Sequence, residues 1–210
     1  MPANGQAALR LTLASYPRFG VRMTRQTPMD LTSLTPDRQR EYDSLARARK
    51  PRPDGSLGGP FDPWLLNPEL SHRLRGLGGA LWERTSLDRG MVELAISIVG
   101  KIWEANVEWT AHAPRAVEYG IPQSFLDDVL AGRRPSGTQE QELVFDVCMS
   151  MHTDHKLPRA LYDRAVSAFG EQGLMEIVAI TGYYILVSMT LNAFEVQVAP
   201  GVQAPFAREL

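Results

Sequence analysis

Hydrophobic residues recur at intervals of three and four positions along most of this 210-residue chain. That interval places them on one face of an α-helix. Proline, glycine and short polar runs separate these segments, and such residues are typical of helix starts and ends. No segment combines a strict apolar–polar alternation with the turn residues of a β-hairpin. We therefore expect an all-α bundle of about eight helices, over residues 36–48, 68–84, 87–103, 107–119, 122–131, 138–152, 158–169 and 174–198.

Two segments interrupt this pattern. Residues 50–63 are dense in proline and glycine, which predicts an irregular loop, and loops of this length often cover or line a site. From Met1 to Met29 the chain has no acidic residue, although it carries four arginines. This composition is typical of a transit peptide, but a disordered tail or an upstream start codon before a true start near Met23 would give the same pattern. We expect residues 1–30 to form a disordered or leader-like extension and residues 31–210 to form a single helical domain.

The composition narrows the functional classes. A hydrophobic content of 44% with 22% charged residues is typical of a soluble globular protein, and the net charge of −2 argues against nucleic acid or anionic lipid as a partner. The only cysteine is Cys148, so an intrachain disulfide is excluded. We expect a cytoplasmic protein, or an organellar one if the leader directs import. The apolar run 177–191 is shorter than the ~20 residues of a bilayer span and predicts a buried helix.

The segment from residue 93 to residue 122 carries the candidate chemistry. Glu108 and His112 are four residues apart on one predicted helix, so their side chains share a face. Glu93 lies on the preceding predicted helix. A pair of this kind on a helix surface is common and contributes only a few tenths of a kcal/mol, about 0.2–0.5. The additional Glu93 is what favours a functional site.

The spacing resembles that of the carboxymuconolactone decarboxylase family, which includes the alkylhydroperoxidase D-like proteins. The peroxidase branch carries Glu-x11-Cys-x2-Cys-x3-His, and the same frame here reads Glu93, Ala105, Glu108 and His112. Both cysteine positions are therefore replaced. The decarboxylase branch similarly lacks the cysteines and has an acid four residues before its histidine. The resemblance covers roughly residues 60–200 and implies an alkylhydroperoxidase D-like helical fold.

The missing cysteines argue against a thiol peroxidase, because that reaction needs a nucleophilic and a resolving thiol. The resemblance instead implies decarboxylation of a small carboxylated lactone or related ring metabolite, as in the catabolism of aromatic compounds, without a cofactor. In that reaction we expect His112 to act as general acid/base and Glu108 as its partner. Glu93 would be a second acid or a relay across the helix pair.

Four further residues are candidates for contact with the substrate. Trp109 adjoins Glu108, although aromatic residues at such spacing are more often part of a core. Arg89 lies four residues before Glu93 and would suit a substrate carboxylate, or would be a solvated cation at the start of its helix. Tyr184 and Asn192 lie on the apolar closing helix, where a buried hydroxyl or amide needs a partner.

The sequence leaves other functions open. His152 and His155 could share a metal ion, but a typical zinc site needs a third or fourth ligand, so we expect no metal. A non-catalytic scaffold or binding protein of the same fold remains an alternative, as does a related lyase, isomerase or hydratase. The resemblance also implies assembly as a homo-oligomer, a trimer or hexamer, with the apolar closing helix at the interface.

Overall fold

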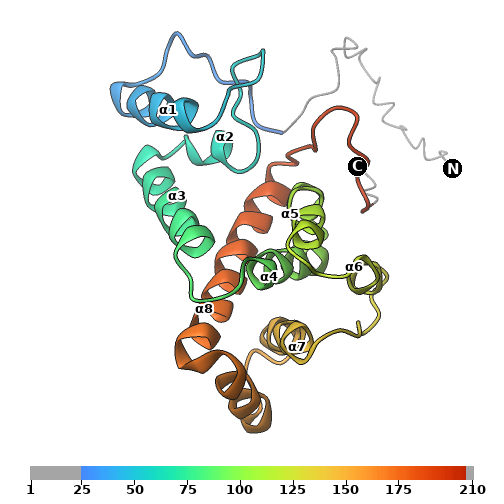
Figure 1. The fold of residues 1–210 in the computed structure, drawn as a ribbon. Coiled ribbons are helices and arrows are strands. Elements are labelled where there is room, and N and C mark those ends of the chain that lie inside the picture. The colour runs from blue at the N-terminus through green and yellow to red at the C-terminus, as the bar shows by residue number, and fades with distance from the viewer. Residues whose placement is uncertain (1–24, 207–210) are drawn as a thin grey trace, which may run out of the picture.

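In the computed structural model, which describes residues 25–206, the chain forms eight α-helices and no β-strand within that range (Figure 1). The all-α prediction is confirmed. The predicted extension falls mostly on residues 1–24, which lie outside the described residues. The helices are α1 (Pro36–Ala48), α2 (Phe61–Trp64), α3 (Pro68–Glu83), α4 (Arg89–Ile102), α5 (Asn106–Glu118), α6 (Gln123–Leu130), α7 (Gln139–Thr153) and α8 (Arg159–Ala193).

Side-chain caps fix where four of the eight described helices begin. The Thr35 hydroxyl accepts from the backbone of α1, the Asn67 side chain does the same for α3, and Thr138 forms a capping box with Gln141 at α7. The start of α4 differs from the prediction. Its cap is Asp88, whose carboxylate accepts from Gly90 N–H at 2.9 Å. Ser86, which also precedes this helix, does not cap it and instead donates its hydroxyl to Glu176 on α8 at 2.7 Å.

The last two predicted helices form one element, α8. They meet at Gly170, where φ is 70° and ψ is 170°, a backbone conformation that favours glycine and that bends the helix there. The helix ends at Ala193, five residues before the predicted end at Val198. The backbone turns at Glu195, where φ is 50°, and the N–H of the next residue closes the helix end on Leu191 O at 2.9 Å.

By length and composition α8 could cross a membrane, since an 18-residue window within it has a mean hydropathy of 1.7. It is the one such helix in the part of the chain that the structure describes. However, 56% of that window is buried inside the fold. A core helix of a globular domain has the same properties, and the contacts of α8 with α4 and α7 give it that role.

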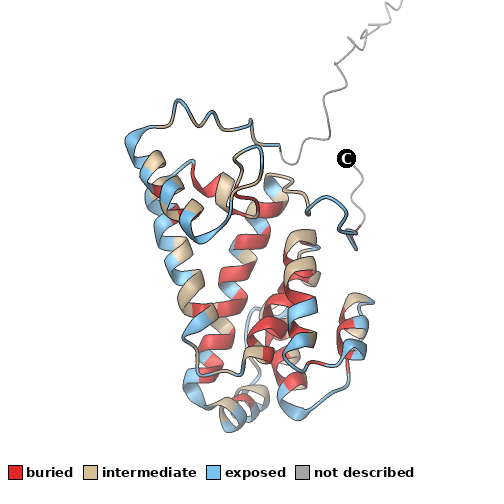
Figure 2. Ribbon diagram, turned by 45° about the horizontal axis from the view of Figure 1, so that its top comes forward, coloured by how far each residue is buried: buried red, intermediate tan, exposed pale blue. Residues whose placement is uncertain are grey.

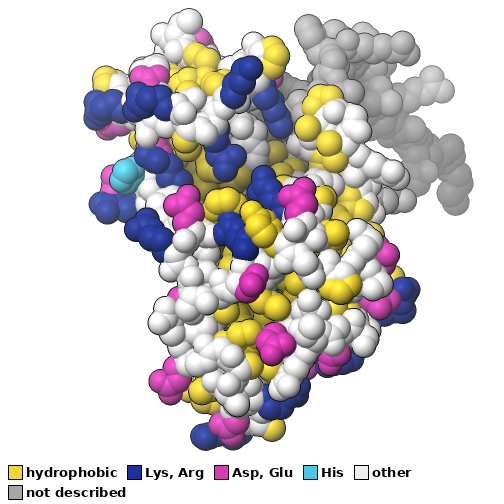
Figure 3. All heavy atoms as spheres, in the orientation of Figure 1, with side chains coloured by type: hydrophobic (Ala, Val, Ile, Leu, Met, Phe, Trp, Pro, Cys, Tyr) yellow, Lys and Arg dark blue, Asp and Glu magenta, His cyan; other side chains and the backbone are white. Residues whose placement is uncertain are grey.

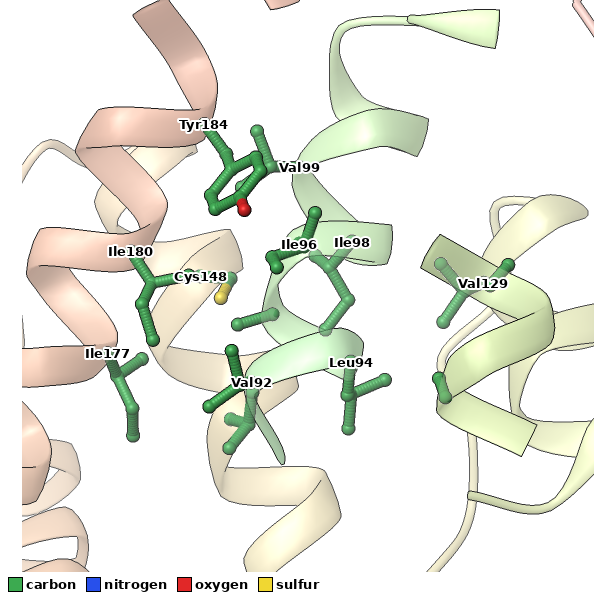
Figure 4. Close-up of a cluster of buried hydrophobic side chains, with 14 of the residues drawn as sticks. Val92, Leu94, Ile96, Ile98, Val99, Val129, Cys148, Ile177, Ile180 and Tyr184 are labelled. Atoms are coloured by element: carbon green, nitrogen blue, oxygen red, sulfur yellow. The ribbon is translucent and has the colours of Figure 1, made fainter. Parts of the chain in front are cut away.

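Helix α4 is the centre of the fold and packs against α5, α7 and α8. Buried residues concentrate on these helices, whereas α1 and α3 are mostly exposed or intermediate (Figure 2). Figure 4 shows side chains from α4, α7 and α8 meeting in the core, among them Ile96, Cys148 and Ile180. Gly100 lets α5 approach α4 closely, because a methyl group there would lie 3.1 Å from the backbone nitrogen of Trp109. The two helices that carry the motif are therefore held face to face.

The C-terminal segment is anchored on α5 at Phe206, which is buried in the core. The Asn106 side chain binds the backbone of Phe206 at two points, accepting from its N–H at 2.9 Å and donating to its carbonyl at 3.0 Å. The Phe206 ring packs edge-on against Trp109 at a centroid distance of 6.0 Å. We call this arrangement the Phe206 anchor.

Candidate active site

Glu93 is the centre of a buried polar cluster between α4 and α5. It is fully buried, and its two carboxylate oxygens have separate partners. Oε2 lies 2.6 Å from His112 Nδ1, and Oε1 accepts a hydrogen bond from the Trp82 indole N–H at 2.8 Å. Burial acts to raise the pKa of Glu93, but the hydrogen bond with His112, the charge of His112 and the Trp82 N–H together lower it below the usual value. Glu93 is therefore held ionised.

His112 lies between the two acids. Its Nδ1 faces Glu93, and its Nε2 is 3.4 Å from Glu108 Oε2. That second approach is not a hydrogen bond, since Glu108 Oε2 is buried and has no hydrogen-bond partner among the described residues. An ionised Glu93 accepts from an Nδ1–H, and this leaves Nε2 directed at Glu108. The structure thus brings together the three residues that the sequence frame singles out, from two helices.

Glu108 has the opposite electrostatic character to Glu93. Its pKa is raised, because burial outweighs the opposing charges of His112 and Arg49. It is 5% exposed. Two carboxyl groups on either side of one imidazole therefore have pKa values pushed in opposite directions, Glu93 towards the anion and Glu108 towards the protonated acid. Pairs of titratable groups separated in this way are typical of acid/base sites.

The structure refines the predicted pairing in one respect. We expected Glu108 to be the histidine's main partner, but the shorter contact is with Glu93, at 2.6 Å against 3.4 Å. Glu108 lies one turn before His112 on the same helix, whereas Glu93 approaches the imidazole from the facing helix α4. A residue on the facing helix points directly across the interface. The geometry makes Glu93 the residue that orients the imidazole.

Tyr184 from α8 forms a wall of the cluster. Its ring meets the His112 ring edge-on at a centroid distance of 5.5 Å, and Figure 4 shows it extending towards α4 beside Val99. Burial, with a smaller contribution from Glu108, raises the pKa of Tyr184 well above its usual range, so its hydroxyl stays protonated. Tyr183 lies next to it at 5.1 Å and donates its hydroxyl to Leu74 O on α3 at 3.1 Å. Tyr184 thus touches the cluster, as a substrate-contact candidate should.

Arg89 borders the cluster on the Glu93 side. Its guanidinium stacks on the Trp82 ring, 3.2 Å from the centroid, and its Nε is 3.5 Å from Glu93 Oε1. Its Nη2 is buried without a hydrogen-bond partner within residues 25–206. Arg89 is therefore not the solvated cation that the sequence left open. It supports the charge of Glu93 and keeps one donor unused.

The two remaining candidates make their contacts elsewhere. Trp109 packs on Phe206 in the core, and the Asn192 amide donates to Trp103 O at the end of α4 at 2.7 Å. Both contacts are with groups outside the Glu93–His112–Glu108 cluster. The Asn192 hydrogen bond joins α8 to the end of α4, and the Trp109 contact joins α5 to the C-terminal segment.

Trp82 is the member of the cluster that the sequence did not reveal. It lies on α3, near the helix end, and contacts both Glu93 and Arg89. No spacing rule relates it to the motif, because α3 and α4 are joined by an irregular turn. Its only sequence signal is an indole in an amphipathic helix, and such a residue usually needs a hydrogen-bond partner when buried.

Other polar residues do not join the cluster. His155 is exposed, and His152 lines a separate hollow of about 330 Å³ formed by residues of α4, α6 and α7. His72 is exposed on α3 beside Arg75, at 3.3 Å. Within residues 25–206, no group of three or more His, Cys, Asp or Glu side chains is arranged to hold a metal ion.

Cys148 is buried on α7, and burial raises the pKa of its thiol to about 11. Its sulfur lies 3.4 Å from the Thr181 hydroxyl of α8. A thiol in this environment is almost entirely protonated at neutral pH and is a poor nucleophile.

Comparisons with known proteins identify the fold. No protein-family model and no curated protein matches this chain. Among solved structures, an uncharacterized peroxidase-related protein with an alkylhydroperoxidase AhpD core from Ralstonia eutropha JMP134 matches with a TM-score of 0.69 and 15% identity, over 86% of this chain and 95% of the other. An uncharacterized peroxidase-related protein from Silicibacter sp. TM1040 matches with a TM-score of 0.64 and 15% identity, over 81% and 91%.

A third structure with this fold is the debrominase Bmp8, a cysteine-to-alanine variant in complex with 2,3,4-tribromopyrrole. It has a TM-score of 0.58 and 14% identity, over 89% of this chain and 94% of the other. At these identities the likeness shows the fold alone. The chain therefore has an alkylhydroperoxidase D-like fold, in which the helices that carry the resemblance, α4 and α5, also carry the buried cluster.

Proposed function

We propose that the protein is a thiol-independent acid/base enzyme that decarboxylates a small carboxylated lactone or a related ring metabolite. The observation that carries this proposal is the pair of carboxyl groups on either side of His112, with the pKa of Glu93 lowered and that of Glu108 raised. Such a pair is arranged to move a proton. The only cysteine is buried with a pKa raised to about 11, so it does not support a thiol reaction.

The proposed reaction needs one proton transfer to carbon. The bond between the lactone and its carboxylate breaks, carbon dioxide leaves, and the electron pair moves onto the lactone carbonyl as a dienolate. The Glu108–His112 pair then delivers a proton to carbon and is reloaded from solvent. Glu93 keeps the imidazole in the tautomer that presents Nε2 to Glu108. The protonated Tyr184 hydroxyl would serve as a donor to the developing oxyanion.

The proposal is tested by turnover of carboxymuconolactone-type acids, measured as carbon dioxide release. We expect His112→Ala and Glu108→Gln to lower kcat by about 10²–10⁴-fold, the usual contribution of a general acid/base. His72→Ala is the matched control, because His72 is exposed on α3 and lies outside the cluster. Equal rates for wild type and His112→Ala would reject the mechanism. An inactive wild type on every such acid would reject the decarboxylase and favour the scaffold alternative.

A further inference from the structure

The face of α5 that carries the cluster continues towards the surface. Arg115 follows Glu108 by seven residues and His112 by three, so all three lie on the same side of the helix. Arg115 is exposed. Within residues 25–206 its guanidinium forms no ion pair and no hydrogen bond. The charge of Arg115 nevertheless acts on Glu108.

A second arginine reaches the same place from the N-terminal part of the chain. Arg49 is the residue that follows α1, and its guanidinium carbon lies 3.9 Å above the centre of the Phe61 ring. This stacking fixes the side chain without neutralising it. Like Arg115, Arg49 forms no ion pair with a carboxylate in the described part of the protein. Among residues 25–206, therefore, the two exposed arginines have no carboxylate partner.

Ring contacts connect Phe61 to the buried cluster. Phe61 meets Trp64 at 5.6 Å and Trp64 meets Tyr183 at 6.5 Å, both edge-on. Tyr183 in turn adjoins Tyr184, whose ring contacts His112. The Phe61 ring, on which Arg49 stacks, is therefore connected to Tyr184 and His112 through successive aromatic contacts.

The charges of the two arginines meet at Glu108. Both act to lower its pKa, and burial still keeps it raised. They also act on each other, because the pKa of Arg49 is lowered first by burial and then by repulsion from Arg115. Because the pKa of Glu108 is raised, its carboxyl group offsets these charges less, and no ion pair within residues 25–206 neutralises either guanidinium. Figure 3 shows Lys and Arg side chains, with Asp and Glu side chains among them, around exposed hydrophobic ones in the region of α2, α3 and α5. Such a surface is complementary to an anion with an apolar body.

We infer that Arg49 and Arg115 bind a carboxylate of the substrate and hold its ring against Glu108 and His112. The inference rests on the proposed function for the identity of the substrate, but not for the binding itself. Two guanidiniums form charge-assisted, often bidentate hydrogen bonds with a carboxylate. Arg89 is less suited to this task, since its guanidinium is already engaged by Glu93 and the Trp82 ring. Arg49 and Arg115 therefore determine selectivity for an acid over its neutral analogue.

The binding test uses a saturated five-membered lactone that carries one carboxylate, with its methyl ester as the uncharged match. Dissociation constants of both probes are measured by ligand-observed NMR on the full chain. We expect wild type to bind the acid more tightly than the ester. Arg49→Gln and Arg115→Gln should each weaken acid binding about tenfold and leave ester binding unchanged. A tenfold loss lies at the low end of the range for a hydrogen bond to a charged group, because the site is partly solvated. Arg49→Lys should recover part of the loss.

Arg159→Gln is the matched control, because Arg159 pairs with Asp163 at the exposed start of α8. Its acid affinity should equal that of wild type. Thermal unfolding checks that each variant is folded, and Arg115→Gln, at an exposed position, tests the inference even if Arg49→Gln is unstable. Equal binding of acid and ester to wild type, or wild-type acid affinity in both glutamine variants, would overturn the inference.

The same variants separate this inference from the proposed function. If acid-selective binding depends on the arginines but wild type turns over no carboxylated lactone, the decarboxylase proposal fails and the anion site stands. If wild type turns over such an acid and both glutamine variants keep its KM, the anion site is rejected and the acid/base mechanism stands.

Discussion

The hydrogen bond from Trp82 to Glu93 gives the sharpest test of how the site is held. Trp82→Phe removes the indole N–H that Glu93 Oε1 accepts at 2.8 Å and keeps an aromatic ring beside Arg89. Because Glu93 is fully buried and ionised, losing this donor leaves a buried charge with one hydrogen bond fewer. A hydrogen bond to a buried charged group contributes about 1.5–3 kcal/mol, so the free energy of unfolding at pH 7 should fall by about that amount.

Trp103→Phe is the matched control for the lost ring volume. The Trp103 indole nitrogen is buried without a hydrogen-bond partner among the described residues, so its removal costs packing only and relieves an unsatisfied donor. Urea denaturation of wild type and both variants measures the three free energies of unfolding. We expect Trp82→Phe to lose about 1.5–3 kcal/mol more than Trp103→Phe at pH 7.

The pH dependence of the two free energies of unfolding tests whether their difference comes from the charge of Glu93. The pKa of folded Glu93 lies below its ordinary value of 4.5, so the stability it contributes is present above that value and is lost as the pH falls through the folded pKa. The contribution of the Trp82 donor depends on the charged form. The difference in the free energy of unfolding between Trp82→Phe and Trp103→Phe should therefore persist from pH 7 towards 4.5 and shrink at lower pH. A gap that is absent at pH 7, or one that does not change with acidification, would refute the reasoning.

Three further predictions concern other parts of the structure. Burial raises the pKa of Glu108, which means that the folded state resists its ionisation, so Glu108→Gln should raise the thermal midpoint more at pH 8 than at pH 4; an equal rise at both would contradict this. Cys148, with a pKa raised to about 11, should resist labelling by iodoacetamide at pH 7.5 and react fully in urea; rapid labelling of the folded protein would contradict its burial. We propose that the exposed apolar face of α8 contacts a second copy of the chain, so Met189→Lys, where Met189 is 52% exposed, should lower the molar mass found by light scattering. Leu70→Lys on α3, where Leu70 is 49% exposed, is the control and should not change it.

The sequence predicts the helices well and their ends less well, for a physical reason. Thr35 and Thr138 cap the helices that directly follow them, since the bonds they make are local. Ser86 has the same chemistry but binds Glu176, 90 residues away, and Asp88 becomes the cap. The end of α8 similarly depends on a turn at Glu195 that no residue in the sequence marks. Local signals fail where a distant partner competes for the same group.

The candidate site follows the same rule. The spacing of Glu93, Glu108 and His112 predicts that they share the α4–α5 interface, because a short connection folds one helix back on the other. Trp82 and Arg49 reach the site from α3 and from the segment after α1, and neither has a fixed sequence distance to the motif. Trp82 supports the charge of Glu93, and Arg49 is one of the two arginines proposed to bind an anion. That information lies in the tertiary packing.

The Phe206 anchor has a practical consequence for anyone who shortens or labels this protein. Phe206 fills a core position against Trp109, and Asn106, the first residue of α5, grips its backbone. Deleting the chain from Phe206 onward would remove a packing partner of α5, the helix that bears His112. It would also expose Trp109, which is now 8% exposed, to solvent. An affinity tag or fluorophore is therefore best appended after an intact Phe206, never substituted for it.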